Sequence, residues 1–424
     1  MSKKSPWAWV PTLYFAEGVP YVAVMTISLI MYKRLGLSNT DITLYTSWLY
    51  LPWVIKPLWS PFVDMLRSKR WWIVAMQVLI AAALGGVAFT IPGPWWLQGS
   101  LCFFWLMAFS SATHDIAADG FYMLGLDQHE QAYFVGIRST FYRIATIFSS
   151  GVLVGLAGAL QVITRNIRYS WSLVFYLMAG LFIGLWLYHH WVLPKPAEDG
   201  MKSTKTAGEI MQEFKQTVIT FFQKPQVWAG ICFMLFYRMP EGLLAKVSAL
   251  FLVDAPHNGG LGLSDGEYGL VQGTVGVIGL TLGGILGGIV ASRDGLKKWL
   301  WPMVMAITLP DLVYVYLSYV MPSDLIVINV SVFVEQFGYG FGFSAYMLYL
   351  IYYSQGNHKT SHYALCTAFM ALSMMIPGLF AGALQEAVGY QTFFLIVVVA
   401  CSLTYVVTAF LKIDPEFGKK KTDE

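Results

Sequence analysis

Long apolar segments separated by short polar turns account for nearly the whole chain. Counting runs of about 20 apolar residues, the length that an α-helix needs to cross a bilayer, gives twelve segments. They cover residues 8–32, 40–64, 71–92, 95–125, 131–160, 170–193, 226–253, 265–291, 298–320, 324–354, 361–385 and 389–411. The pattern therefore predicts an all-α membrane protein with twelve transmembrane helices.

The composition supports a membrane protein and excludes several other classes. Of the 424 residues, 57% are hydrophobic and only 12% are charged, whereas soluble domains carry about a quarter charged residues. The four cysteines, Cys102, Cys232, Cys366 and Cys401, stand singly in apolar runs, so we expect small buried side chains and not a disulfide or metal framework. No phosphate-binding loop, zinc spacing or catalytic triad is present. We therefore expect no enzyme activity, no cofactor and no nucleic-acid partner.

The distribution of positive charge predicts the orientation of the chain. If the N-terminus is cytoplasmic, most Lys and Arg residues of the loops fall on the inner side. The outer side receives only four, Lys33, Arg34, Arg165 and Arg168. Because cytoplasmic loops of membrane proteins are enriched in Lys and Arg, both termini are predicted to face the cytoplasm.

The two halves of the chain repeat one another. The segment Leu35–Asp41 corresponds to Leu261–Glu267 at an offset of 226, and Glu17-Gly18 corresponds to Glu241-Gly242 at 224. A nearly constant offset across six spans indicates a duplication of six helices, which is typical of secondary transporters. We expect an N-terminal six-helix bundle at 1–193, a linker at 194–224, a C-terminal bundle at 225–412 and a cytoplasmic tail at 413–424.

The linker has a helical pattern of its own. It opens with the turn-forming stretch Pro194–Gly200 and continues with apolar residues at helical spacing among Lys and Glu. These apolar residues are Ile210, Met211, Phe214, Val218, Phe221 and Phe222. The pattern predicts an amphipathic helix lying on the inner leaflet.

Related loops follow the second and the eighth spans. Residues Ser60–Arg70 correspond to Gly288–Lys298 at an offset of 228. Both resemble the loop of the major facilitator superfamily in which an acid and following basic residues close the inner gate, although Ser292 stands at the acid position of the second copy. The candidate gating residues are Asp64, Arg67, Arg293 and Asp294.

Eleven ionisable residues, His114 aside, lie in the interiors of the predicted spans, away from their ends. They are Glu17, Lys56, Asp115, Asp119, Arg138, Arg143, Arg238, Glu241, Lys246, Asp311 and Glu335. Seven of them lie on spans 1, 4, 7 and 10, which line the central cavity in the facilitator fold. Because a charge inside the bilayer is costly, these residues are expected to face a water-filled cavity or to pair with one another. Asp311, on span 9, is the exception to this distribution.

Pairing is expected within each half of the chain. Asp115 and Asp119 are four residues apart and share one helix face, so either is expected to pair with Lys56 or Arg143. In the second half, Glu335 is expected to pair with Arg238 or Lys246. Arg138 is expected to reach the inner interface, and His189 and His190 are expected at the membrane surface.

Eight of these residues are the candidate substrate- or proton-binding set. Asp115, Asp119 and Glu335 are carboxylates suited to proton handling, and Arg143 is suited to an anionic group through its planar guanidinium. Glu17 and Glu241 adjoin Gly and Pro residues, which interrupt spans at binding sites. The set is Glu17, Lys56, Asp115, Asp119, Arg143, Arg238, Glu241 and Glu335. A static, purely structural set of ion pairs remains the alternative.

Several stretches resemble the AmpG-type muropeptide permease family of the major facilitator superfamily. They are Phe15–Pro20, Lys56–Asp64, Ser111–Asp119, Tyr142-Arg143 and Phe333–Gln336 with Gly340. The resemblance covers nearly the whole chain. Its most specific parts are the Lys-x-x-Trp-Ser-Pro-x-x-Asp and Asp-x-x-x-Asp patterns.

The resemblance implies the facilitator fold and a function. That function is proton-driven import of N-acetylglucosaminyl-1,6-anhydro-N-acetylmuramyl peptides across the bacterial inner membrane for cell-wall recycling, by symport and without a cofactor. The partners would be membrane lipid and the saccharide-peptide substrate, and the expected state is a monomer. The chain departs from the family at Glu17, His114 and Tyr122, where a small polar residue, Gln and Lys are usual.

Two other functions remain open from the sequence. A transporter of another anionic metabolite, such as acetyl-coenzyme A, would use the same fold. A membrane sensor would bind a ligand without carrying it.

Overall fold

Every regular element in the described part of the chain is helical. The computed structural model describes residues 5–126, 128–196, 199, 206–356 and 359–418. Within these residues α-helices alternate with short 3-10 and π-helical segments, and no strand occurs. The predicted all-α class is therefore confirmed.

The long helices lie where the apolar pattern predicts them. By length and apolar composition, nine helices among the described residues can cross a membrane. They are Pro6–Arg34, Lys69–Thr90, Trp96–Gly125, Gly136–Thr164, Ile167–Val192, Asp265–Asp294, Leu296–Val320, Leu325–Ser354 and Ser361–Ala409. The count of twelve stays a prediction.

Interrupted helices explain the difference between nine and twelve. The predicted span 40–64 is divided into α3 (Asn39–Trp48) and α4 (Leu51–Leu66), and the span 226–253 into α11 (Val227–Phe236) and α12 (Met239–Val253). The last two predicted spans form the single element α18 (Lys359–Ala409), which contains the non-helical residue Gly389 at φ 77°. Glycine adopts this left-handed conformation without strain.

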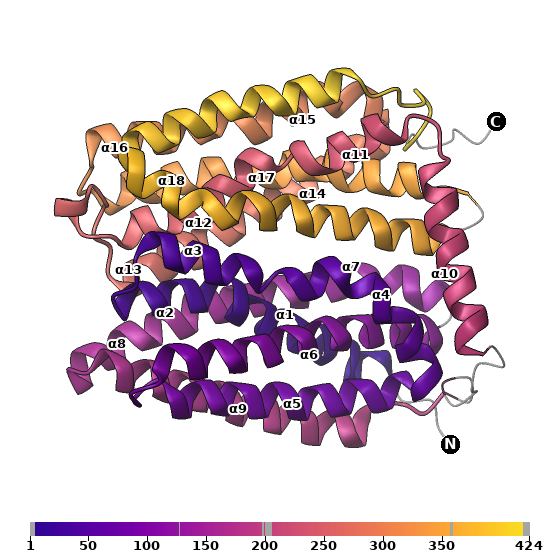
Figure 1. Cartoon of the computed structure of the whole chain (residues 1–424), viewed down its shortest axis with the longest axis horizontal. Coiled ribbons are helices and arrows are strands. Elements are labelled where there is room, and N and C mark those ends of the chain that lie inside the picture. Colours follow the sequence, from indigo (N-terminus) through magenta and orange to yellow (C-terminus); the bar gives the residue numbers. More distant parts are fainter. Residues whose placement is uncertain (1–4, 127, 197–198, 200–205, 357–358, 419–424) are drawn as a thin grey trace. The chain divides into compact units, whose positions relative to one another are not determined.

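Contacts divide the chain into two compact units (Figure 1). The first comprises Met1–Leu35 and Ile55–Met211, and the second comprises Gly36–Val54 and Gln212–Glu424. The remaining helices of the first unit are α1 (Val10–Val22), α2 (Ser28–Arg34), α5 (Lys69–Thr90), α6 (Trp96–Gly125), α7 (Gln128–Thr146), α8 (Val154–Thr164) and α9 (Ile167–Val192), with the short segments η1 (Pro6–Ala8), η2 (Ala23–Ile27) and η3 (Ile147–Leu153). Those of the second are α13 (Asp265–Leu270), α14 (Val277–Asp294), α15 (Leu296–Thr308), α16 (Leu312–Val320) and α17 (Leu325–Ser354), with η5 (Pro256–Asn258), η6 (Val271–Gly276) and η7 (Leu309–Asp311).

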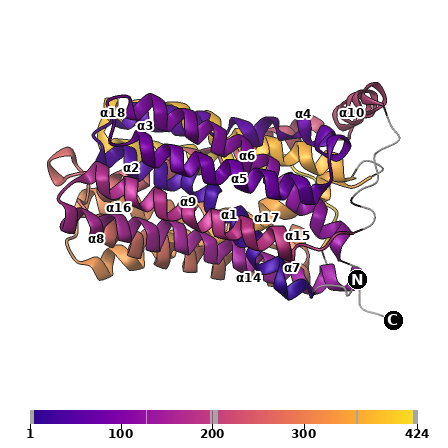
Figure 2. The same cartoon turned by 90° about the horizontal axis from the view of Figure 1, so that it is seen from below.

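In the first unit, α5 packs against both α6 and α9, and α1 packs against α7. Figure 2 shows α5, α6 and α9 side by side. Gly18 permits the close approach of α1 to α7, because a Cβ atom there would lie 2.8 Å from the Cβ of Ala145 and 3.2 Å from the carbonyl oxygen of Tyr142. This contact fixes which face of α7 is turned toward α1.

In the second unit, α17 packs between α14 and α15. Glycines on α17 allow both contacts: a Cβ at Gly340 would lie 2.1 Å from the Leu280 carbonyl oxygen, and one at Gly338 would lie 2.2 Å from that of Ala306. Small residues that let helix backbones meet are typical of membrane bundles.

Helix α3 packs against α18 within the second unit. The Asn39 side-chain amide donates hydrogen bonds to Gln385 Oε1 at 2.6 Å and to the Tyr390 hydroxyl at 3.0 Å. A Cβ at Gly382 would lie 2.1 Å from the Asn39 carbonyl oxygen. Residues 36–54 therefore group with the second unit, although they fall within the segment 1–193 that the repeat assigns to the N-terminal bundle.

The linker forms the predicted helix, α10 (Ala207–Phe222). Its expected position with the apolar face in lipid is wrong for Phe221, whose side chain is fully buried against Tyr353, His362 and Phe369. Lys224 follows and donates hydrogen bonds to the carbonyl oxygens of Tyr353 at 2.5 Å and Gln355 at 2.7 Å. The end of α10 thus packs on protein.

Candidate functional site

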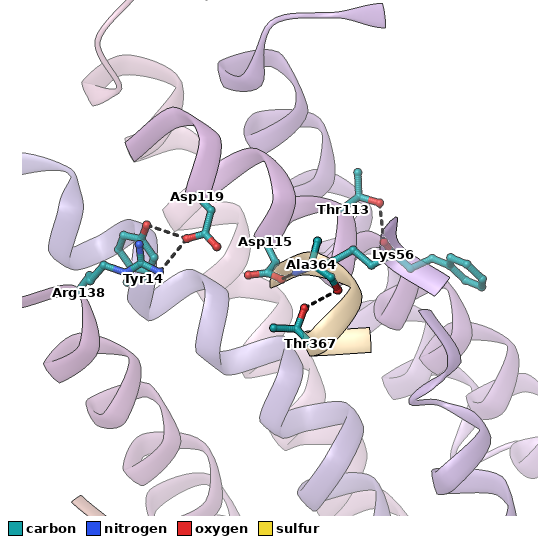
Figure 3. A network of polar contacts seen from close by, with 9 residues as sticks. Tyr14, Lys56, Thr113, Asp115, Asp119, Arg138, Ala364 and Thr367 are labelled. Carbon is teal, nitrogen blue, oxygen red and sulfur yellow. Dashed lines mark hydrogen bonds and ion pairs between the residues drawn. The ribbon is translucent and has the colours of Figure 1, made fainter. Parts of the chain in front are cut away.

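The charges of the first unit gather around α6. We call the first-unit charge cluster the six residues Tyr14, Glu17, Lys56, Asp115, Asp119 and Arg138, which α1, α4, α6 and α7 supply. Asp115 and Asp119 project from adjacent turns of α6 toward different partners (Figure 3).

Asp115 forms an ion pair with Lys56, as the sequence predicts. The ammonium of Lys56 also donates a hydrogen bond to the Asp115 carboxylate. Lys56 lies in α4, which contains proline at positions 52, 57 and 61. The pair neutralises two charges that would each be costly inside a bilayer.

Asp119 pairs with Arg138, and the predicted pairing with Arg143 is wrong. Arg138 Nη2 donates to Asp119 Oδ1 at 2.8 Å, and the Tyr14 hydroxyl donates to the same oxygen at 3.2 Å. The Arg138 guanidinium also lies 4.4 Å from the Tyr14 ring centroid and 5.1 Å from that of Tyr122. Arg138 is therefore held by a carboxylate and two aromatic faces, and its reach to the inner interface stays a prediction.

Glu17 lies beside these pairs, and Arg143 lies further along α7 than Arg138. Glu17 lies close enough to Asp115, Asp119 and Arg138 to interact with them electrostatically, and its Oε2 atom has no hydrogen-bond partner among the described residues. Arg143 is half-buried on α7. The helix does not break at Gly18-Val19-Pro20; α1 continues to Val22, and the π-helical segment η2 follows.

The cluster is accessible in part. The exposed fractions of the side chains are 23% for Lys56, 18% for Asp115, 29% for Arg138 and 42% for Asp119. Charged groups that are paired inside the protein and yet partly accessible suit the binding of a polar molecule.

A buried polar chain supports α6 behind the cluster. Thr12 Oγ1 lies 2.9 Å from His189 Nε2, the Gln77 amide nitrogen lies 2.8 Å from His189 Nδ1, and the same nitrogen lies 3.1 Å from His114 Nε2. His189 is fully buried, so its expected position at the membrane surface is wrong. His114 directly precedes Asp115, and the chain therefore fixes this turn of α6 against α1, α5 and α9.

The candidate residues of the second unit are buried. Glu335 is 2% exposed and accepts a hydrogen bond from Gln336 at 2.9 Å. Its predicted pairing with Arg238 or Lys246 and its expected exposure to water are both wrong. Arg238 donates instead to the Tyr339 hydroxyl and lies 4.6 Å from the Phe343 ring centroid, and Lys246 donates to Thr46 Oγ1 at 2.5 Å.

Glu241 lies beside Glu335 and Asp311. The interruption of the seventh span is confirmed: α11 ends at Phe236 and α12 begins at Met239, which places Glu241 in the first turn of α12. Glu241, Asp311 and Glu335 each have a carboxylate oxygen within 4.8 Å of the others.

The candidate gating residues whose side chains are described contact side chains that are close to them in the sequence. Asp294 accepts a hydrogen bond from Trp299 Nε1 at 3.0 Å and lies 3.3 Å from Lys298 Nζ and 3.8 Å from Arg293 Nε. Arg67 is exposed, with its guanidinium 5.8 Å from the Trp71 ring centroid. The side chain of Asp64 lies outside the part of the chain that is described. The gating role of these residues stays a prediction.

Four residues of these sites lie outside the candidate set that the sequence predicts. Tyr14 and Arg138 stand at helical positions that give no sign of their partner, and Asp311 lies on span 9, away from the spans expected to line the cavity. Gln77 does carry a signal, since it is a lone amide in the apolar run 71–92.

Comparisons with known proteins agree on the family. The model of the BT1 family matches residues 17–286, and that of the Major Facilitator Superfamily matches residues 242–424. The chain is 26% identical over 400 residues to the anhydromuropeptide permease of Escherichia coli K12, covering 92% of this chain and 76% of the relative. It is 25% identical over 405 residues to the putative transporter AmpG 4 of Rickettsia conorii, covering 91% and 92%.

Solved structures agree on the fold. The nucleoside transporter NupG superposes with a TM-score of 0.69 at 16% identity, covering 97% of this chain and 100% of that one. A D-xylose–proton symporter superposes with a TM-score of 0.67 at 13% identity, covering 94% and 95%. The chain therefore belongs to the BT1 family and is an AmpG-type member of the major facilitator superfamily, a multi-pass membrane protein with the facilitator fold.

Proposed function

We propose that this protein is a proton-coupled secondary transporter that imports anhydromuropeptides across the bacterial inner membrane, with both termini in the cytoplasm. Two relatives that match about nine-tenths of its length are named a permease and a putative transporter, and the solved structures compared above are transporters. Both favour transport over enzymatic chemistry.

The observation that carries the proposal is the paired, accessible first-unit charge cluster. Two cations, Lys56 and Arg138, each hold one carboxylate of α6, while both members of each pair keep part of their surface accessible. A muropeptide carries carboxylates, amides and hydroxyl groups, so it can exchange hydrogen bonds with both signs of charge. Arg138 and Lys56 would bind substrate carboxylates, and Asp119 and Asp115 would accept from its donors.

The aromatic surroundings of Arg138 orient its guanidinium for a substrate. Tyr14 and Tyr122 form an edge-to-face pair with ring centroids 5.9 Å apart, and both rings are buried. Arg138 lies against these two rings, while 29% of its side chain stays accessible. The rings therefore hold the guanidinium from the protein side and leave its accessible part for a substrate carboxylate.

Counterflow in proteoliposomes tests the proposed substrate. Vesicles loaded with unlabelled anhydromuropeptide at equal pH on both sides are expected to accumulate labelled anhydromuropeptide transiently, because exchange requires only a shared carrier. External unlabelled anhydromuropeptide is expected to compete, and acetyl-coenzyme A is not. If acetyl-coenzyme A competed and unlabelled anhydromuropeptide did not, the substrate would be an anionic metabolite such as acetyl-coenzyme A. If the label bound without exchange, the protein would be a sensor.

A further inference from the structure

Three carboxyl groups from distant parts of the chain meet inside the second unit. Glu241 comes from the first turn of α12, Asp311 from η7 and Glu335 from α17. One oxygen of each lies within 4.8 Å of the others, and the three residues are only 6%, 3% and 2% exposed. We call these three residues the second-unit carboxyl cluster.

The packing of the helices brings these groups together. A Cβ at Gly338 would lie 2.2 Å from the Ala306 carbonyl oxygen and 2.7 Å from Pro310 Cγ, so the end of α15 touches α17 within one turn of Glu335. Pro310 lies in η7, the 3-10 segment that carries Asp311. Glycine and proline thus place two acids side by side, which a regular span 9 would not do.

The cluster lacks the direct ion pairs that balance the first unit. No ion pair involves Glu241, Asp311 or Glu335 in the described structure. Asp311 accepts a hydrogen bond from the Cys401 thiol at 3.3 Å, and Glu335 accepts one from Gln336. The Arg238 guanidinium interacts with Glu241 electrostatically but is hydrogen-bonded to Tyr339.

Three negative charges at this separation and burial do not coexist. Like charges that share a buried site force one carboxyl group or more to take up a proton, as in the aspartic-protease dyad. In the first unit, by contrast, Lys56 and Arg138 each hold one of the two aspartates in direct ion pairs, which leaves only Glu17 of the described first-unit charge cluster without one. In the described part of the second unit none of the three acids has such a pair, so it has the stronger demand for a proton.

An unsatisfied hydroxyl group points to the same site. Tyr314 on α16 is fully buried, and its hydroxyl has no hydrogen-bond partner among the described residues. It interacts electrostatically with Glu335 and Glu241, and Ser248 is a further polar neighbour of the hydroxyl. Because buried hydroxyl groups are nearly always paired, this donor can turn to a carboxylate that has lost its proton.

We propose, on the basis of the transport function above, that Glu241, Asp311 and Glu335 form the binding site of the coupling proton, with Tyr314 as the donor that stabilises the deprotonated state. A proton entering from outside converts one carboxylate to a carboxylic acid, and the same proton leaves to the cytoplasm. The groups next to the cluster are Arg238, Tyr314, Gln336 and Cys401, and Ser248 lies next to Tyr314. Substrate binding and proton binding would then be assigned to different units.

Transport assays on neutral variants test this assignment. Wild type and the variants Glu335→Gln, Asp311→Asn and Glu241→Gln are reconstituted with labelled anhydromuropeptide. At one proton per substrate, an inward gradient of about one pH unit supports about tenfold accumulation. We expect the three variants to lose this accumulation while counterflow at equal pH persists, and the exposed control Glu416→Gln to accumulate like wild type.

The possible outcomes separate this assignment from the proposed function. If all three variants accumulated the label like wild type, the proton site would be wrong. It would also be wrong if a Na⁺ gradient at equal pH drove accumulation by wild type and the three variants lost that accumulation. Absence of counterflow in wild type would instead overturn the proposed substrate.

An infrared measurement that needs no substrate tests the site in variants that fold too poorly for transport assays. The infrared C=O stretch of a protonated carboxylic acid is absent from an ionised carboxylate. Purified wild type at neutral pH is expected to show this band, and Glu335→Gln or Asp311→Asn is expected to weaken it, whereas Glu416→Gln leaves it unchanged. A band that none of the cluster variants alters would contradict the site.

Discussion

Replacing Lys56 or Asp115 singly by alanine is expected to abolish uptake and to lower the stability of the protein, because each change leaves its partner as an unpaired charge. Breaking a buried ion pair by removing one partner costs about 3–5 kcal/mol, which corresponds to roughly a hundredfold or more in an equilibrium constant. Both side chains are less than one quarter exposed, so solvent relieves only part of this cost. Thermal unfolding in detergent and initial uptake rates measure the two effects.

The double variant Lys56→Ala with Asp115→Ala separates a structural pair from a binding pair. Removing both charges leaves no uncompensated ion, so stability is expected to recover toward the wild-type value. Uptake is expected to stay lost, because the substrate has lost both of its partners at this position. Recovery of uptake together with stability would assign the pair a purely structural role.

Replacing Arg138 is expected to have the second large effect. Arg138→Ala leaves Asp119 without its cation beside Glu17 and Asp115, and uptake is expected to fall by about a hundredfold. Arg138→Lys keeps the charge but not the planar fork that contacts the carboxylate and the tyrosine rings together, so an intermediate loss is expected. Tyr14→Phe removes one hydrogen bond to a charged acceptor, worth about 1.5–3 kcal/mol at most.

The expected order of these variants is the measurable outcome. Initial uptake rates should decrease from wild type through Tyr14→Phe and Arg138→Lys to Arg138→Ala. Arg168→Ala is a matched control, because Arg168 is exposed and also lies over an aromatic ring, 5.4 Å from the Trp96 centroid. An Arg138→Lys variant with wild-type rates would show that the charge alone matters and that the fork does not.

Membrane helices were predictable because length and apolar composition determine them almost alone. The first span, expected at 8–32, is observed as Pro6–Arg34, and the tenth, expected at 324–354, as Leu325–Ser354. The Lys56–Asp115 pair was predictable in the same way, since opposite charges in two apolar segments have few other partners.

The partner of Asp119 was not predictable, because it depends on the rotation of α7. Arg138 and Arg143 are five residues apart, and so roughly 140° apart around a helix of 3.6 residues per turn. The contact of Gly18 with Ala145 and Tyr142 sets the face that α7 turns toward α1. Nothing in the sequence pattern distinguishes the two arginines before this contact is known.

The second-unit carboxyl cluster was missed for a related reason. Glu335 and Glu241 were expected to face water and cations because they lie on spans 10 and 7. The 3-10 turn at Leu309–Asp311 and the close contact at Gly338 bring a third acid against them instead. Helix periodicity describes a regular helix and does not include such an interruption.

Uptake of labelled anhydromuropeptide by proteoliposomes of controlled orientation tests the central claim most directly. With an imposed gradient that is acidic on the side of entry, we expect the label to accumulate above its external concentration, and a protonophore to abolish this accumulation. Without a gradient, the label should only equilibrate. Equal uptake with and without the gradient, or no uptake above that of protein-free vesicles, would contradict proton-coupled import of muropeptides.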